Sequence, residues 1–207
     1  TSAITNLSDC FSECTKLTKL EIGKWDTSNV KNLDCCFYDC KSLCSLNLSK
    51  WNTSKLNTLD SCFEGCKELH NLDISTWSTS EVVYMGHCFS DCKNLRELDI
   101  SLWNVSKVRI LSHCFEGCTK LTILDLALWN TSRVETIEYC FARCTSLVYL
   151  NIENWVINER CNAKDMFNEC DNLSLIKCRQ DTFEEFKRFL LGTWNYANGF
   201  AIKMNNK

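Results

Sequence analysis

The apolar and polar residues of this chain follow a pattern that repeats every 26 positions. Its clearest marker is the block Cys-Phe-x-x-Cys, which occurs six times and returns a seventh time as Met-Phe-x-x-Cys. The seven blocks begin at positions 10, 36, 62, 88, 114, 140 and 166. No insertion interrupts this register between Cys10 and Cys170. A fixed period of this length indicates a solenoid, in which each unit stacks its apolar residues on both neighbours.

Two shorter periodicities alternate within each unit. Residues 20–22 alternate apolar and polar side chains, which predicts a short strand. Asp26, Thr27 and Ser28 then offer helix N-cap side chains, and the apolar residues that follow have helical spacing: Val30, Leu33, Phe37 and Cys40. We therefore expect an α/β repeat solenoid with a parallel sheet on one face and short helices on the other.

The period ends beyond Cys170, so we divide the chain into a solenoid of about seven repeats, residues 1–178, and a C-terminal capping helix and tail, residues 179–207. Asp181 and Thr182 are the expected cap of that helix. Its apolar face would carry Phe183, Phe186, Phe189, Leu190 and Trp194. At the other end, residues 1–4 align with residues 27–30, so we expect the sequence to begin inside a unit, as a fragment would.

The unit resembles the BspA-like repeats of bacterial surface proteins, which have the form M-F-x-x-C-x-x-L-x-x-L-D-L-S-x-W-D-T-S-N-V-x-x-M. The resemblance covers residues 1–178. It departs mainly in placing Cys where those repeats have Met, so that Met85 and Met166 alone keep the usual residue in the complete repeats. The resemblance implies a leucine-rich repeat of bacterial type, found in surface adhesins and in proteins delivered into host cells, with no catalytic residues.

Composition and charge narrow the class of partner. A net charge of −3 and a pI near 5.7 give no general attraction for nucleic acid or anionic lipid. No run of 18 or more apolar residues is present, so we expect no membrane span. The remaining class is a protein partner, and we expect the chain itself to be a monomer.

The chain has 17 cysteines, of which 13 occupy two repeat positions. One set is Cys14, Cys40, Cys66, Cys92, Cys118, Cys144 and Cys170; the other is Cys10, Cys36, Cys62, Cys88, Cys114 and Cys140. A bond within a pair four residues apart would have poor disulfide geometry, and the total is odd. We interpret both sets as buried ladders of reduced thiols. They favour a reducing compartment, the bacterial cytoplasm or a host cell reached by translocation. The alternative is the bacterial cell surface.

Neither a metal site nor a catalytic site is expected. The chain lacks the Cys-x2-Cys pairs of structural zinc sites, and no cofactor is indicated. Its three histidines, His70, His87 and His113, show no base aimed at a single thiol, so we expect no enzyme. His87 and His113 belong to a column that stacks in adjacent units: Cys35, Ser61, His87, His113, Tyr139 and Asp165. Surface placement, metal binding and pH sensing stay open for this pair.

Recognition is expected on the outward residues of the strands. One column forms an acidic stripe: Glu21, Asn47, Asp73, Asp99, Asp125, Asn151 and Lys177. Its neighbour becomes apolar toward the C-terminal end: Lys19, Ser45, Asn71, Glu97, Ile123, Tyr149 and Leu175. The predicted partner-binding residues are Glu21, Asn47, Asp73, Glu97, Asp99, Ile123, Asp125, Tyr149 and Asn151.

These two columns suit a basic protein with an apolar anchor, bound on the concave strand face. A structural origin of the acidic column, as repeat consensus, is the competing interpretation. The functional prediction is a protein-binding scaffold that engages or inhibits a target protein. The alternative is a surface adhesin for host matrix or other cells.

Overall fold

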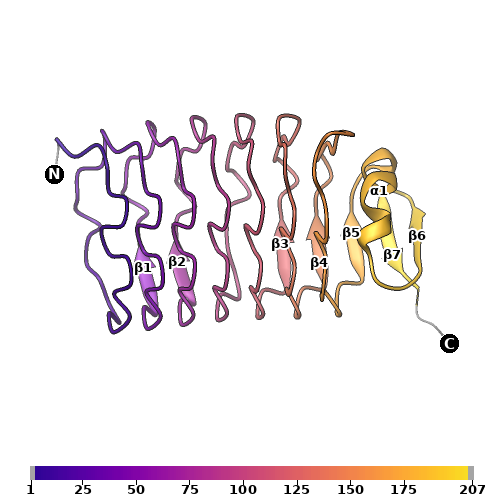
Figure 1. The fold of residues 1–207 in the computed structure, drawn as a ribbon, viewed down its shortest axis with the longest axis horizontal. Helices are drawn as coiled ribbons and strands as arrows, with labels where there is room; N and C mark the ends of the chain where they lie inside the picture. Colours follow the sequence, from indigo (N-terminus) through magenta and orange to yellow (C-terminus); the bar gives the residue numbers. More distant parts are fainter. Residues whose placement is uncertain (1–2, 205–207) are drawn as a thin grey trace.

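A computed structural model describes residues 3–204, so Thr1, Ser2 and the last three residues of the predicted tail lie outside the described range. Successive coils of 26 residues lie side by side in an elongated stack, with the N-terminus at one end and the C-terminus at the other (Figure 1). Each coil hydrogen-bonds to residues one period away, as in the bridge between Asn32 and Thr58. The 26-residue period of the sequence is therefore the length of one coil.

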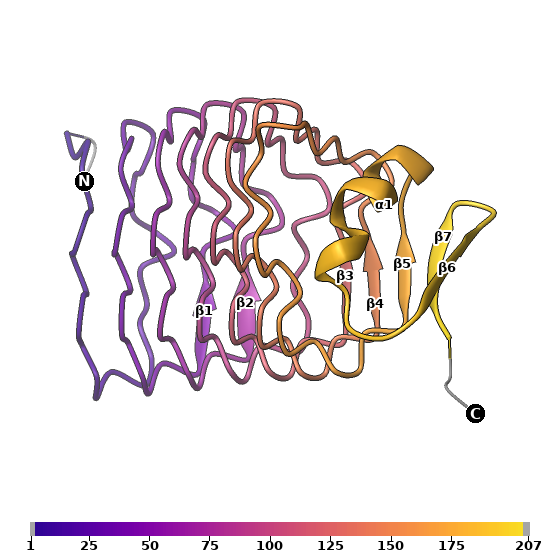
Figure 2. The ribbon, with the colours of Figure 1, turned by 45° about the vertical axis from the view of Figure 1, so that its right-hand side comes forward.

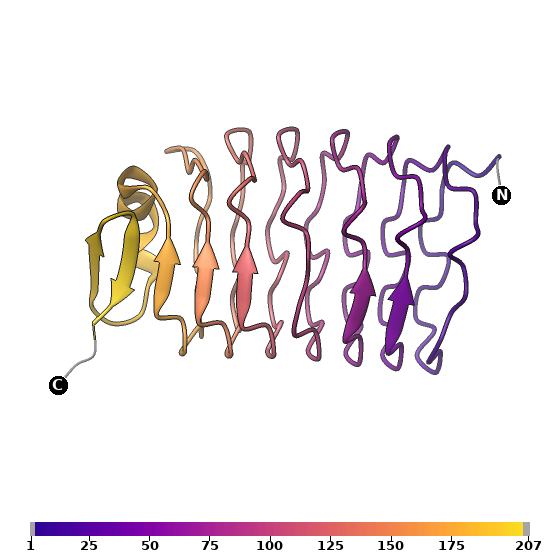
Figure 3. The same cartoon turned by 180° about the vertical axis from the view of Figure 1, so that it is seen from behind.

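Short parallel strands occupy one side of the stack (Figure 3). β1 (Ser45–Asn47) and β2 (Asn71–Asp73) form a two-stranded sheet. β3 (Ile123–Asp125), β4 (Tyr149–Asn151) and β5 (Leu175–Lys177) pair in the same parallel manner in a second sheet. Partners in register are 26 residues apart, so every column of the sequence becomes a straight row of side chains.

Two of the expected strands are missing from the described chain. Residues 19–21 make a single bridge, between Lys19 and Ser45. Residues 97–99 lie between β2 and β3 and form no strand, which separates the two sheets. Nothing in the structure explains the gap at residues 97–99.

The prediction of a short helix in every unit is wrong. Between residues 3 and 204 the helices are α1 (Gln180–Phe186) and a 3₁₀ turn, η1 (Lys187–Phe189), both outside the repeats. In the repeats the limb opposite the strands consists of tight turns and a second row of parallel bridges. Its backbone bonds run between coils: the Phe37 N–H donates to the Cys62 carbonyl at 2.9 Å. Cys35 and Asp39 have positive φ angles of 53° and 55°, which a right-handed helix excludes.

Aromatic side chains fill the interior in two rows. The phenylalanines of the Cys-Phe-x-x-Cys blocks stack with ring centroids 5.4 to 5.6 Å apart from one coil to the next. The tryptophans stack similarly, as in the 6.0 Å pair of Trp77 and Trp103. Their indole N–H groups donate to backbone carbonyls of the preceding coil, such as Trp77 Nε1 to Leu48 O, just after β1, at 3.1 Å. Each coil is thus held to its neighbours by apolar contact and by hydrogen bonds that burial makes costly to break.

The C-terminal segment covers the last coil with a helix and a hairpin (Figure 2). Phe186 of α1 meets Phe167 edge-on at 5.4 Å, and Thr182 Oγ1 donates to the Trp155 carbonyl at 2.8 Å. β6 (Trp194–Ala197) and β7 (Phe200–Lys203) form a hairpin that pairs antiparallel with β5. The prediction that Leu190 and Trp194 belong to the helix is wrong, because Leu190 has an extended backbone and Trp194 begins β6. The N-cap is Arg179, without a side-chain capping bond, rather than Asp181 and Thr182.

Candidate functional site

A hollow of about 660 Å³ lies on the strand side of the first three coils. We call the surface made by the outward strand residues and the turn that follows them the strand face, and this hollow the strand-face groove. The groove is lined by Lys19, Leu20, Glu21, Gly23, Lys24, Ser45, Leu46, Asn47, Lys50, Asn71 and Asp73. In β1, Leu46 is buried in the core, whereas Ser45 and Asn47 on either side point outward. The two columns singled out in the sequence therefore share one surface.

The predicted partner-binding residues differ in accessibility. Glu21, Asn47, Glu97, Asp99, Ile123 and Asp125 are exposed, and Asp73 and Tyr149 are half-buried. Asn151 is only 6% exposed. Its register partner Lys177 forms an ion pair with Glu153, 2.6 Å long, beside it. Asn151 is thus far less accessible than the other predicted partner-binding residues.

The carboxylates of the acidic column also have a local role. Asp125 Oδ1 accepts the Ala127 N–H at 3.0 Å, and Asp99 Oδ1 accepts the Ser101 hydroxyl at 2.9 Å. Asn47 makes the equivalent bond from the Ser49 N–H at 3.1 Å. These bonds close the turn after the strand, and an amide oxygen serves as well as a carboxylate. The side-chain oxygen belongs to the fold, whereas the negative charge is not needed for it.

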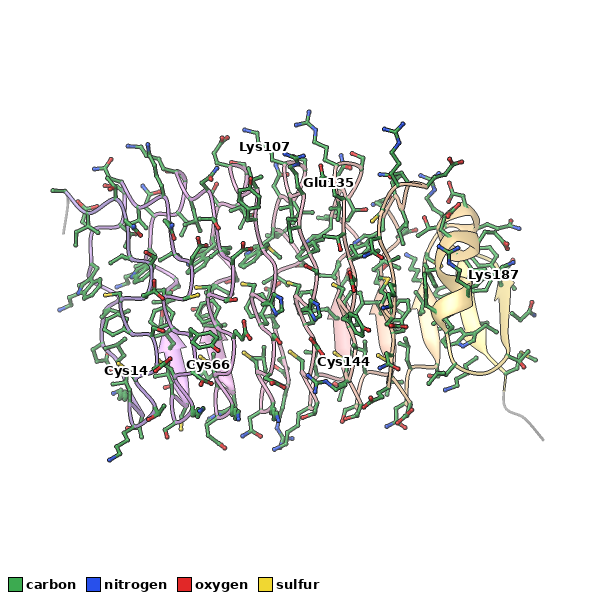
Figure 4. The ribbon with its side chains drawn as sticks, in the orientation of Figure 1. Cys14, Cys66, Lys107, Glu135, Cys144 and Lys187 are labelled. Carbon is green, nitrogen blue, oxygen red and sulfur yellow. The ribbon has the colours of Figure 1, made fainter. Side chains whose placement is uncertain are left out.

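Three of the four carboxylates in the acidic column are not held in an ion pair within the described chain; the fourth, Glu21, pairs with Lys19 at 2.8 Å. Asp73, Asp99 and Asp125 make no ion pair with any residue between 3 and 204. Charges on the opposite edge behave differently. Lys107, at the upper edge of Figure 4, pairs with Glu81 at 2.7 Å, and Arg109 pairs with Glu135.

Two exposed leucines were missed by the sequence analysis. Leu102 and Leu128 are 75% and 62% exposed, and they occupy the positions that Lys24 and Lys50 hold in the first coils. They lie in turns, after residues 97–99 and after β3, where the alternation of inward and outward residues no longer determines which side a residue faces. The sequence does show that this repeat position changes from lysine in the first coils to leucine in later ones, and that change could have revealed them.

The repeated cysteines form two rows, and one of these makes hydrogen bonds. Cys14, Cys66 and Cys144 mark that row in Figure 4. From Cys40 to Cys170, each thiol of this row donates to a phenylalanine carbonyl one coil earlier, at 2.9 to 3.1 Å. Burial raises the pKa of Cys118 to about 12, so its thiol stays protonated at neutral pH. In the described chain no cysteine forms a disulfide, and no cluster of three or more metal-ligating side chains is present.

The histidine column forms a stack on the limb opposite the strands. The rings of His87 and His113 lie 4.4 Å apart and nearly parallel, and Tyr139 continues the stack at 5.1 Å. His113 Nδ1 lies 2.5 Å from Glu116 Oε2, and Arg143 contacts the other oxygen of Glu116 at 2.9 Å. Burial is the main cause that lowers the pKa of His87. Parallel stacked rings direct their nitrogen lone pairs side by side, so they do not converge on one metal ion.

No helix in the described part of the chain is long and apolar enough to cross a membrane. The repeats themselves match the family described as "Mycoplasma protein of unknown function, DUF285" in two overlapping segments, residues 1–94 and 57–177. The chain belongs to the DUF285 family. The DUF285 match ends at the last coil, so it covers the repeats and leaves out α1 and the hairpin. The chain matches no curated protein and no solved structure.

Proposed function

We propose that this DUF285 chain is a leucine-rich repeat solenoid of the BspA-like type that binds one protein partner through its strand face. It acts as a scaffold that engages or inhibits the partner and carries out no reaction of its own. The repetition of one coil supports a long binding surface over a single catalytic pocket. The buried thiols also support this view, because burial raises their pKa and leaves them poor nucleophiles.

The single observation that carries the proposal is that Asp73, Asp99 and Asp125 have no ion-pair partner within residues 3–204. These three carboxylates make no ion pair within the described chain, although Glu21 on the same face pairs with Lys19, whereas charged residues on the opposite edge pair across coils. Unpaired charge beside exposed apolar side chains, here Ile123, suits a partner with basic and apolar residues. The matching partner is a protein with a basic surface and an apolar anchor.

The test removes this charge without disturbing the turns. The triple variant D73N/D99N/D125N keeps a side-chain oxygen at each position, as Asn47 does naturally. A control variant, E13Q/E159Q/E169Q, removes three exposed acidic charges elsewhere on the chain. Both are immobilised beside the original chain, and proteins captured from bacterial and host-cell extracts are quantified by mass spectrometry. We expect capture of a salt-sensitive partner by the original chain and the control but not by the triple variant. Equal capture by all three, with equal melting temperatures, would remove the strand face from the proposal.

We further propose that the chain works in a reducing compartment. The thiols of one row donate to carbonyls of the preceding coil, a contact that oxidation would destroy. Thiol titration after denaturation of freshly prepared protein should find all 17 cysteines reactive. Extensive oxidation in native material would favour the cell surface instead.

A further inference from the structure

The strand face changes its chemistry along the stack. Three periods of 26 residues beyond the groove, the same positions carry different side chains. Lys24 and Lys50 are replaced by Leu102 and Leu128, and Ser45 is replaced by Ile123. The register shows no insertion across this interval, so equivalent residues occupy equivalent places in their coils. One continuous surface therefore has two chemically distinct ends.

The N-terminal end carries more lysines than carboxylates, because Lys19, Lys24 and Lys50 line the groove together with Glu21 and Asp73. Lys24 and Lys50 are exposed and line the groove. Neither lysine makes an ion pair within residues 3–204, whereas Lys19 at the same end is paired with Glu21 at 2.8 Å. Two unpaired ammonium groups on adjacent coils favour an acidic group on the partner.

The C-terminal end is apolar and acidic. Leu102, Leu128 and Ile123 are 75%, 62% and 60% exposed. The unpaired carboxylates of Asp99 and Asp125 lie in the column between them. Carboxylates at this end disfavour an anionic lipid surface and favour apolar side chains accompanied by a lysine or arginine.

We propose that the strand face binds one extended protein segment in a fixed orientation. Acidic residues of the segment lie over Lys24 and Lys50. Its apolar and basic residues lie over Leu102, Leu128 and Asp125. This rests on the proposed function and specifies the chemistry of the partner. Coils are spaced as neighbouring strands, about 4.8 Å apart, so three coils place the two ends about 14 Å apart. An extended chain advances about 3.4 Å per residue, so the centres of the two blocks of the segment lie about four residues apart.

The experiment selects the segment without assuming its sequence. Random 12-residue peptides displayed on phage are selected on the full immobilised chain and sequenced. We expect enriched peptides with one acidic block and one block of apolar and basic residues, the centres of the two blocks about four residues apart. A representative peptide is then synthesised, and its Kd is measured for the chain and its variants.

Variants test each end separately. L102S/L128S should weaken the peptide at least tenfold, whereas L191S, which changes an exposed leucine outside the strand face, should have no effect. K24E/K50E should weaken it at least fivefold, and a peptide with its acidic residues changed to lysine should regain affinity for that variant. A K55E control, on the opposite edge, should bind normally.

The remaining outcomes separate this inference from the proposed function. One outcome is that the selected peptides fail to bind D73N/D99N/D125N and yet have acidic and basic residues mixed along their length. That result overturns the fixed orientation and leaves the strand face as the binding surface. Peptides indifferent to every strand-face variant overturn both. Failure to enrich any peptide, or enrichment of apolar peptides without charge, overturns the orientation.

Discussion

Two cysteines of one coil, Cys62 and Cys66, allow a sharp test of how the thiol rows stabilise the stack. Both side chains are fully buried, at 0% exposure. Cys66 Sγ donates to the Phe37 carbonyl at 3.1 Å. Cys62 Sγ makes no hydrogen bond in the part of the chain that the structure describes. The two sites therefore have equal burial and differ in the presence of an acceptor.

The expected magnitudes follow from that difference. Replacing either cysteine by alanine removes one buried sulfur and should lower the free energy of unfolding by about 1 to 2 kcal/mol. Serine at position 62 would place a hydroxyl in the core without a partner, at an added cost of about 1 to 3 kcal/mol. Serine at position 66 can still donate to Phe37, so its cost should equal that of alanine within about 0.5 kcal/mol.

Urea unfolding of C62A, C62S, C66A and C66S measures these differences under reducing conditions. Tryptophan fluorescence and circular dichroism should give coincident transitions, since a stack of coils can unfold in parts. The quantity of interest is the serine-minus-alanine difference at each site. A difference at position 62 no larger than at position 66 would refute the assignment of a hydrogen-bonding role to one row and a packing role to the other.

Three further predictions concern titration, a buried hydroxyl and a tight turn. Burial holds the pKa of His87 below its ordinary value of about 6.5, so the unfolded chain takes up the proton first. Stability should fall as the pH drops from about 7 through 6.5 and below, less steeply in H87N than in an H70N control, and identical slopes would contradict it. Thr131 Oγ1 donates to the Val156 carbonyl at 2.9 Å and accepts the Val156 N–H at 2.8 Å. T131V should therefore lose about 1 to 3 kcal/mol in urea unfolding, and a loss below about 0.5 kcal/mol would refute this. A Cβ on Gly117, where φ is +69°, would lie 2.4 Å from Asp91 Oδ1, so G117A should lower the melting temperature. Adding D91A to G117A should restore part of the lost melting temperature. If the effects of the two substitutions on the melting temperature simply add, the clash is excluded.

The sequence predicts well what depends on the period alone. Register fixes the rows of Phe, Trp and Cys, and the alternation around Leu46 places Ser45 and Asn47 on one surface. The strands begin one residue earlier than expected, at Ser45 rather than Leu46. Such a shift is within the usual uncertainty of element ends.

The helical limb was mispredicted because spacing alone does not show where backbone bonds go. Val30, Leu33, Phe37 and Cys40 have helical spacing. Backbone N–H groups of this limb nevertheless donate to carbonyls of the next coil, as from Phe37 to Cys62, instead of to residues within a helix. A usable signal was present at the positions of Cys35 and Asp39, whose equivalents include His87, Gly65 and Gly117. Residues of these types tolerate positive φ, and their recurrence marks tight turns.

The surface was harder to predict because it depends on contacts between coils. Asn151 is buried in β4, which pairs with β5 of the next coil. The exposure of Leu102 and Leu128 follows from a turn whose direction the sequence does not determine. Both effects require the three-dimensional stack.

The uniform joint between coils has a consequence for how such a chain can change. Every pair of neighbouring coils makes the same contacts. A phenylalanine of one coil stacks on that of the next, and a backbone carbonyl accepts a hydrogen bond from a thiol of the next coil. Deleting or duplicating 26 residues would leave every joint intact and move Lys50 relative to Leu102 by one step of about 4.8 Å. The distance between two recognition elements can therefore change in steps of one coil without any change to the core.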